Sequence, residues 1–156
     1  ALWQRVFKEV AASYPGIAAT HQYIDALAMF LVKDPGQYQV IVTNNLFGDI
    51  VTDIGGALQG GLGMAASGNI HPGKTSLFEP VHGSAPPLAG KNVANPIGAI
   101  LSTALMLETL GARDESRAIE AAVEASIAAG QTTTDIGGTV RSRGGGEFIS
   151  KNKGKH

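Results

Sequence analysis

The chain has no cysteine among its 156 residues, so it has no disulfide framework, and a reducing cytoplasm is the expected compartment. It also lacks an excess of either charge. With 16% charged residues and a formal net charge of -1, nothing favours nucleic acid or an anionic membrane as a partner. Long apolar runs are missing as well, and the N-terminus does not resemble a signal peptide, so we expect no membrane span and no secretion signal.

Apolar residues and glycine are what the sequence has in quantity. The 44% apolar content and the length predict a folded domain with a hydrophobic core. The 21 glycines gather between residues 55 and 73 and between residues 130 and 146, which indicates tight turns and loops that a ligand can approach closely. The chain opens without Met inside an already helical pattern, so we expect it to be a piece of a longer protein.

The hydrophobic spacing predicts alternating strands and helices, which is typical of α/β folds. Asn95 followed by Pro96 is a strong helix start, with the asparagine as the N-cap. The polar and basic residues 139–156 are expected to form a mobile tail. The expected helices cover residues 2–10, 25–32, 46–58, 96–111 and 114–130, and the expected strands cover residues 17–23, 40–43 and 76–81.

Two carboxylates stand out in the helix expected over residues 46–58. Asp49 and Asp53 are four residues apart, so a helix places both on one face, beside an apolar stripe that contains Ile50 and Ile54. Like charges held this close repel each other unless a cation lies between them, and oxygen ligands suit Mg²⁺ or Mn²⁺. The alternative interpretation is a solvated acidic face with no ligand.

Residues 61–66, GLGMAA, fit the dinucleotide-binding fingerprint G-x-G-x-x-A. That fingerprint needs a strand before it and a helix after it. Here an expected helix precedes it, and glycine, serine and proline follow. We therefore reject a Rossmann fingerprint at this position.

Several separate motifs occur in a fixed order along the chain. They are YIDA at 23–26, NLFGDIVTD at 45–53, FEPVHGSAP at 78–86, AGKNVANP at 89–96 and TTDIGG at 133–138. With these motifs the chain resembles the isocitrate/isopropylmalate family of β-decarboxylating dehydrogenases, most of all its isopropylmalate branch. The similarity extends to about Gly138, and an ordered set of motifs is far more specific than any single one.

The resemblance implies an α/β fold in which helices pack on a mixed sheet, with this chain as about the C-terminal half. Residues 1–60 would be the later half of a dimerisation and substrate domain, and residues 61–138 the returning half of a cofactor domain. It also implies a metal site for Mg²⁺ or Mn²⁺ that is shared across a homodimer. Its ligands would be Asp49 and Asp53 of one subunit and Asp25 of the other.

By the same resemblance, the chain would bind NAD and a small 2-hydroxy dicarboxylate. His82 offers a ring that can stack on adenosine, although a loop histidine in a polar network is the simpler interpretation. Asn95 would meet the adenine, or it would serve only as the helix cap. The cofactor residues implied are Glu79, His82, Gly83, Ser84, Ala85 and Asn95.

Two departures limit what the resemblance implies. Pro87 stands where NAD-using members carry an acid and NADP-using members a base, so NAD over NADP is only the family's default. The family's catalytic lysine and tyrosine, and its substrate-binding arginines, correspond to sequence upstream of this chain. Tartrate or malate, isocitrate and homoisocitrate enzymes therefore remain alternatives to isopropylmalate. A non-catalytic fragment or regulatory subunit, and a generic glycine-rich α/β binding module, remain open too.

Overall fold

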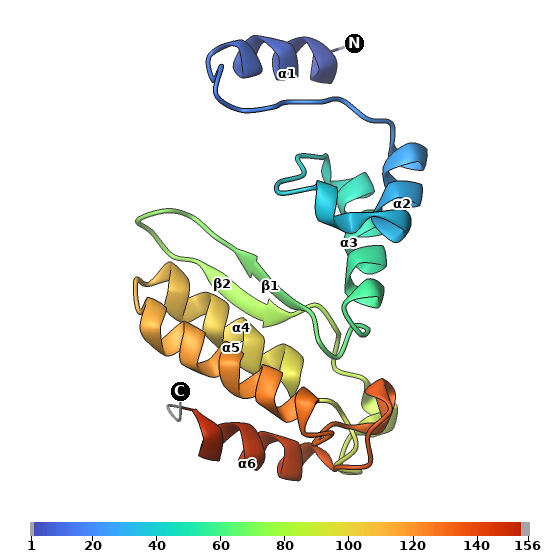
Figure 1. Ribbon diagram of the computed structural model, residues 1–156, viewed down its shortest axis with the longest axis vertical. Coiled ribbons are helices and arrows are strands. Elements are labelled where there is room, and N and C mark those ends of the chain that lie inside the picture. Colours follow the sequence, from blue (N-terminus) through green and yellow to red (C-terminus); the bar gives the residue numbers. More distant parts are fainter. Residues whose placement is uncertain (1, 154–156) are drawn as a thin grey trace. The chain divides into compact units, whose positions relative to one another are not determined.

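The computed structural model describes residues 2–153, which fall into two compact units divided between Ile54 and Gly55 (Figure 1). The boundary lies inside one helix, a few residues before the division expected after residue 60. No helix among the described residues is long and apolar enough to cross a membrane. Each unit is built around its own small hydrophobic core.

Helices dominate the first unit. The start of α3 is explained by the residue before it. The Asn44 Oδ1 atom accepts a hydrogen bond of 3.0 Å from the Phe47 N–H and so caps the first turn of this helix. The core of this unit is formed by Leu27, Leu31 and Val51, which are buried between α2 and α3. The elements of the unit are α1 (Leu2–Ala12), α2 (Ile24–Lys33), the 3₁₀ turn η1 (Pro35–Gln37) and α3 (Asn45–Leu58).

The strands expected in this unit are wrong. Residues 17–23 and 40–43 are irregular, and no strand pairs with either segment within the described part of the chain. A strand needs a hydrogen-bonded neighbour, so a β-branched run alone does not make one. Val40 and Val42 are also 83% and 70% exposed, so these two side chains are not packed into a core.

The second unit stacks helices on a short hairpin (Figure 1). Its strands are antiparallel, with Ala66 opposite Pro80 and Asn69 opposite Leu77, so the sheet of the described residues is a two-strand pair rather than a mixed sheet. Helix α4 packs against the hairpin, α5 against α4, and α6 against α5. The elements are β1 (Ala66–Asn69), β2 (Leu77–Pro80), η2 (Pro86–Leu88), α4 (Ile97–Thr109), α5 (Arg113–Ala128), η3 (Thr134–Ile136) and α6 (Ser142–Asn152).

Helix α6 contradicts the mobile tail expected over residues 139–156. Ile149 of this helix is 4% exposed and belongs to the core of the second unit, together with Ile97, Ala122 and Val123. The tail was expected because the segment is polar and basic, and its three consecutive glycines also disfavour a helix in isolation. Burial of an apolar face stabilises the helix in spite of them. The end of the expected tail, residues 154–156, lies outside the described residues.

Replacing Ile149 with alanine is expected to lower the free energy of unfolding of the second unit by ~2–4 kcal/mol, because it leaves a cavity in the core. Urea unfolding followed by circular dichroism measures the change. Ile127→Ala is the matched control, since Ile127 is 43% exposed on α5, and it should cost less than about 1 kcal/mol. Equal effects of the two substitutions would show that α6 does not pack as described.

Candidate functional site

The two carboxylates of α3 share one face of the helix, as their spacing predicts. Asp49 and Asp53 are both exposed, and neither forms an ion pair with a basic residue of the described chain. The Asn45 Nδ2 atom donates a hydrogen bond of 3.2 Å to Asp49 Oδ2, which limits the rotation of that carboxylate. The arrangement therefore concentrates negative charge, with free oxygen lone pairs, at the surface of α3.

Asp25 lies in the first turn of α2, and the Ala26 N–H donates a hydrogen bond of 2.8 Å to its Oδ1 atom. The fold of one chain does not gather the three predicted ligands. In the part of the chain that the structure describes, no three acidic, histidine or cysteine side chains are close enough to hold a metal ion. The chain thus offers Asp49 and Asp53 as a pair, and the contribution of a partner's Asp25 stays a prediction.

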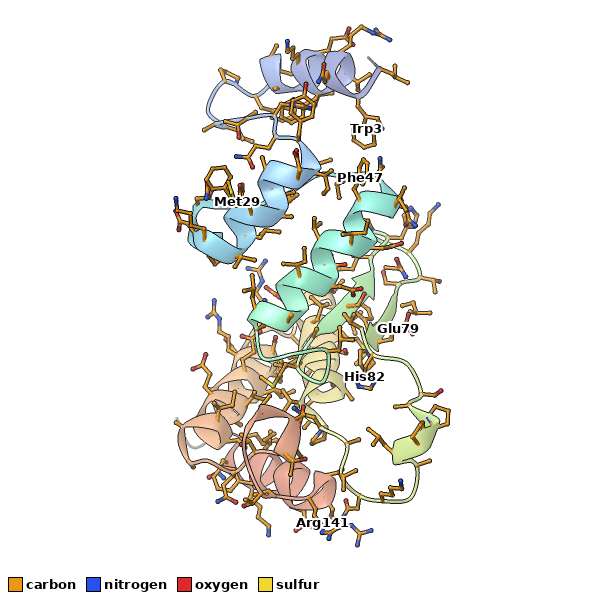
Figure 2. The ribbon with its side chains drawn as sticks, turned by 90° about the vertical axis from the view of Figure 1, so that its right-hand side faces the viewer. Trp3, Met29, Phe47, Glu79, His82 and Arg141 are labelled. Atoms are coloured by element: carbon orange, nitrogen blue, oxygen red, sulfur yellow. The ribbon has the colours of Figure 1, made fainter. Side chains whose placement is uncertain are left out.

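The residues predicted to lie along a cofactor begin on β2 and continue into the loop after it (Figure 2). Glu79 is exposed on the strand, and the Val81 N–H extends the ladder by donating to the Ala65 carbonyl at 3.1 Å. His82 is half-buried, and its Nδ1 atom lies 2.9 Å from the Gly83 carbonyl oxygen. A carbonyl only accepts, so Nδ1 carries the proton, and Nε2 of the neutral ring is left as an acceptor.

The same loop then makes a sharp turn at Ala85. This residue has φ 42° and ψ 61°, in the left-handed region that residues with a side chain rarely adopt, and η2 follows it directly. Such strain gathers at functional sites more often than elsewhere. Gly83 and Ser84 are exposed, and nothing lies within 4 Å of where a Gly83 Cβ would be, so the loop leaves open space beside its backbone.

Asn95 is the most buried of the predicted site residues, with 8% exposure. Its Oδ1 atom accepts a hydrogen bond of 3.0 Å from the Ile97 N–H, as expected for a capping asparagine, although α4 begins at Ile97, one residue later than predicted. Its Nδ2 atom donates to Asp135 Oδ2 at 3.0 Å. We did not predict a role for Asp135, although it stands within the TTDIGG motif that carried part of the resemblance.

The glycines at 61 and 63 do not form a dinucleotide fingerprint, as expected. Helix α3 precedes this segment and strand β1 follows it, which is the reverse of the strand-turn-helix order that the fingerprint requires. Gly63 instead lies against the Asn95 and Asp135 side chains. A Cβ atom at Gly63 would come within 2.9 Å of Asn95 Cβ and 2.8 Å of Asp135 Oδ2.

Comparison with known proteins adds sequence relationships to this geometry. The sequence profile described as isocitrate/isopropylmalate dehydrogenase matches residues 1–151. The 3-isopropylmalate dehydrogenase of Rhodococcus erythropolis is 50% identical over 143 residues, which are 88% of this chain and 42% of that protein. The enzyme of the same name from Streptomyces coelicolor is 48% identical over 149 residues, 91% of this chain and 43% of that protein. The chain therefore spans less than half the length of these curated relatives.

Solved structures are similar over nearly the whole chain. Isocitrate dehydrogenase from Methylococcus capsulatus superposes with a TM-score of 0.89 at 38% identity and covers 97% of this chain and 46% of that one. A β-decarboxylating dehydrogenase from Thermococcus kodakarensis gives a TM-score of 0.86 at 41% identity, covering 97% of this chain and 44% of that one. These matches confirm the predicted fold class and the prediction that the chain corresponds to part of that fold.

Proposed function

Because the chain belongs to the isocitrate/isopropylmalate dehydrogenase family, we propose that it is the part of a 3-isopropylmalate dehydrogenase that supplies metal ligands and one wall of an NAD site. The proposed reaction is oxidation and decarboxylation of the substrate, a step of leucine biosynthesis. The observation that carries the proposal is the exposed pair Asp49 and Asp53 on α3, which no basic residue of the described chain neutralises.

The donor set of α3 fits a hard divalent cation. Carboxylate oxygens are the ligands that Mg²⁺ and Mn²⁺ prefer, and the exposure of both side chains leaves room for substrate oxygens on the same ion. When bound, such an ion polarises the substrate's oxygen and stabilises the negative charge that develops as carbon dioxide leaves. Asn45 supports the site by holding Asp49 through the 3.2 Å hydrogen bond.

The metal site is proposed to be completed by a second copy of the chain in a homodimer. Asp25 is exposed at the start of α2, where its carboxylate is accessible to another molecule. Its own hydrogen bond to the Ala26 N–H occupies only Oδ1, so Oδ2 is left to coordinate a metal ion. Metal binding and dimerisation are therefore expected to strengthen each other.

The NAD site is proposed to extend along β2 and the loop after it, from Glu79 through His82, Gly83, Ser84 and Ala85, with Asn95 at the adenine end. The open space beside Gly83 and the half-buried ring of His82 support this assignment. The nicotinamide would accept the hydride. Pro87 offers neither an acid for a ribose hydroxyl nor a base for a phosphate, so NAD rather than NADP is proposed only as the family's default.

Isopropylmalate is preferred to isocitrate as the substrate because of the degree of similarity. Curated relatives named 3-isopropylmalate dehydrogenase are 48% and 50% identical, whereas the solved isocitrate dehydrogenase is 38% identical. Activity on isopropylmalate and isocitrate, measured side by side in a full-length protein, distinguishes the two substrates.

Titration of the chain with Mn²⁺, followed by water-proton relaxation, tests the metal site. The unaltered chain is expected to bind Mn²⁺, and Asp49→Asn should weaken binding by about tenfold or more, because it removes one of two charged ligands. Asp34→Asn is the matched control, since it makes the same charge change at an exposed position that follows α2. Equal affinities for the Asp49→Asn and Asp34→Asn variants would contradict the proposed metal site.

A further inference from the structure

A hydrogen bond joins two segments of the second unit that lie 40 residues apart in sequence: Asn95, before α4, and Asp135, in η3. We propose that Asp135 is a positioning residue that holds the Asn95 amide in the one orientation that pairs with an adenine base. This inference rests on the proposed function, because it takes Asn95 to lie at the adenine end of the NAD site. It assigns a role to the TTDIGG motif, which the metal and cofactor residues did not use.

The hydrogen-bonding capacity of the Asn95 amide supports the pairing. An asparagine side chain has two N–H donors and an oxygen with two acceptor positions. Ile97 uses one acceptor position at 3.0 Å, and Asp135 uses one donor at 3.0 Å. One donor and one acceptor remain on the same amide. Adenine presents a matching edge, with an amino donor beside a ring nitrogen acceptor, and asparagine pairs with it through two hydrogen bonds.

Two hydrogen bonds, one to the oxygen and one to the nitrogen of the amide, define its orientation, whereas a single hydrogen bond would not. The Ile97 N–H holds the oxygen, but the amide plane can still turn about that single bond. The carboxylate of Asp135 holds the nitrogen and prevents this rotation. Asp135 is itself held, because Thr133 Oγ1 donates to its Oδ1 at 2.5 Å, and Thr133 is 1% exposed.

Close packing at Gly63 removes the space into which the pair could relax. The Gly98 N–H donates to the Gly63 carbonyl at 2.8 Å, and this hydrogen bond connects the segment before β1 to the first turn of α4. A Cβ at Gly63 would meet Asp135 Oδ2 at 2.8 Å, and a Cβ at Gly98 would meet the Gly63 oxygen at 3.0 Å. The Asn95–Asp135 pair therefore lies in a confined position, and preorganised groups of this kind favour one ligand geometry over others.

Binding of three nucleotides to the full 156-residue chain tests the proposal. The probes are adenosine 5′-monophosphate, purine riboside 5′-monophosphate, which lacks the 6-amino group, and nicotinamide mononucleotide. The unaltered chain is expected to prefer the adenine nucleotide to the purine nucleotide by about tenfold. Asp135→Ala should weaken binding of the adenine nucleotide by about tenfold, so that the ratio of the affinities for the adenine and purine nucleotides falls close to one. Binding of nicotinamide mononucleotide should not change.

Two further variants separate positioning from folding. Asp135→Asn keeps an oxygen that can accept the Asn95 N–H, so it should retain most of the adenine preference. Thr133→Val removes the hydroxyl behind Asp135 without touching Asn95, and it should reduce the preference in a chain that still folds. Asp114→Ala, an exposed acid in the first turn of α5, is the matched control and should change nothing.

The outcomes distinguish this inference from the proposed function. If the unaltered chain binds neither the adenine nucleotide nor nicotinamide mononucleotide, the proposed NAD site fails, and the role of Asp135 fails with it. If the unaltered chain prefers adenine but Asp135→Ala and Thr133→Val keep the same affinity and preference, the NAD site stands. Asp135 would then be only a cross-link between η3 and the start of α4.

Discussion

Purified chain supplied with 3-isopropylmalate, NAD and Mg²⁺ is expected to produce no sustained NADH, as followed by absorbance. The resemblance places the family's catalytic lysine and tyrosine, and its substrate-binding arginines, upstream of this chain, which spans only 42% of a curated relative. The described residues also contain no complete three-ligand metal site. Without these groups, the chain is expected to bind parts of the reactants and not to transfer the protons that the reaction needs.

Fusion to the preceding segment of that 50% identical relative should restore turnover by at least about a thousandfold over the chain alone. In the first unit, α1 and Val42 line an open apolar hollow of ≈ 470 Å³, and no strand of the described residues pairs with residues 40–43. Asp49→Asn in the fusion protein should abolish the restored activity, whereas Asp34→Asn should not. Sustained turnover by the chain alone would contradict the expectation.

Gly138→Ala is expected to destabilise the second unit by about 4 kcal/mol or more. A Cβ at this position would lie 1.9 Å from the Thr132 carbonyl oxygen, far inside van der Waals contact. The backbone cannot move aside easily, because the Val140 N–H donates to that same oxygen at 2.9 Å and the Gly138 N–H donates to the Thr133 carbonyl at 2.9 Å. Thr132 and Thr133 are both buried, so the clash would spread into the turn that holds Asp135.

Gly146→Ala is the matched control for this substitution. Gly146 lies in α6, and nothing is within 4 Å of where its Cβ would be. Alanine there should stabilise the protein by ~1 kcal/mol, because it favours the helix over the unfolded chain. Urea unfolding curves of both variants measure the two effects. A Gly138→Ala curve that coincides with that of the unaltered chain would show that the turn at 132–140 is not as tight as described.

Local spacing was sufficient to predict most helices and one strand. The period of apolar residues located α1 to α5, because an amphipathic face is a property of the nearby sequence. The sequence predicted β2 to within one residue at each end, because a serine precedes the strand and a loop follows it. The shared face of Asp49 and Asp53 followed in the same way, from a spacing of four residues on a helix.

Long-range contacts decided the elements that were predicted wrongly. Residues 40–43 have the composition of a strand, but a strand forms only where another segment pairs with it. Residues 142–152 contain three consecutive glycines and few apolar residues, yet the Ile149 side chain packs in the core with residues of α4 and α5. Neither outcome depends on the local sequence alone, so propensity could not predict it.

The sequence by itself determined helices α1 to α5 and where the two carboxylates of α3 lie on their helix, because each depends on residues close together in the chain. It also determined which family the chain resembles, because the order of the motifs along the chain is a property of the sequence. Only the tertiary structure revealed Asp135 against Asn95, with Gly63 packed beside them. These three residues come from segments far apart in sequence, so the hydrogen bond between Asn95 and Asp135 and the packing of Gly63 against them form only when the second unit folds.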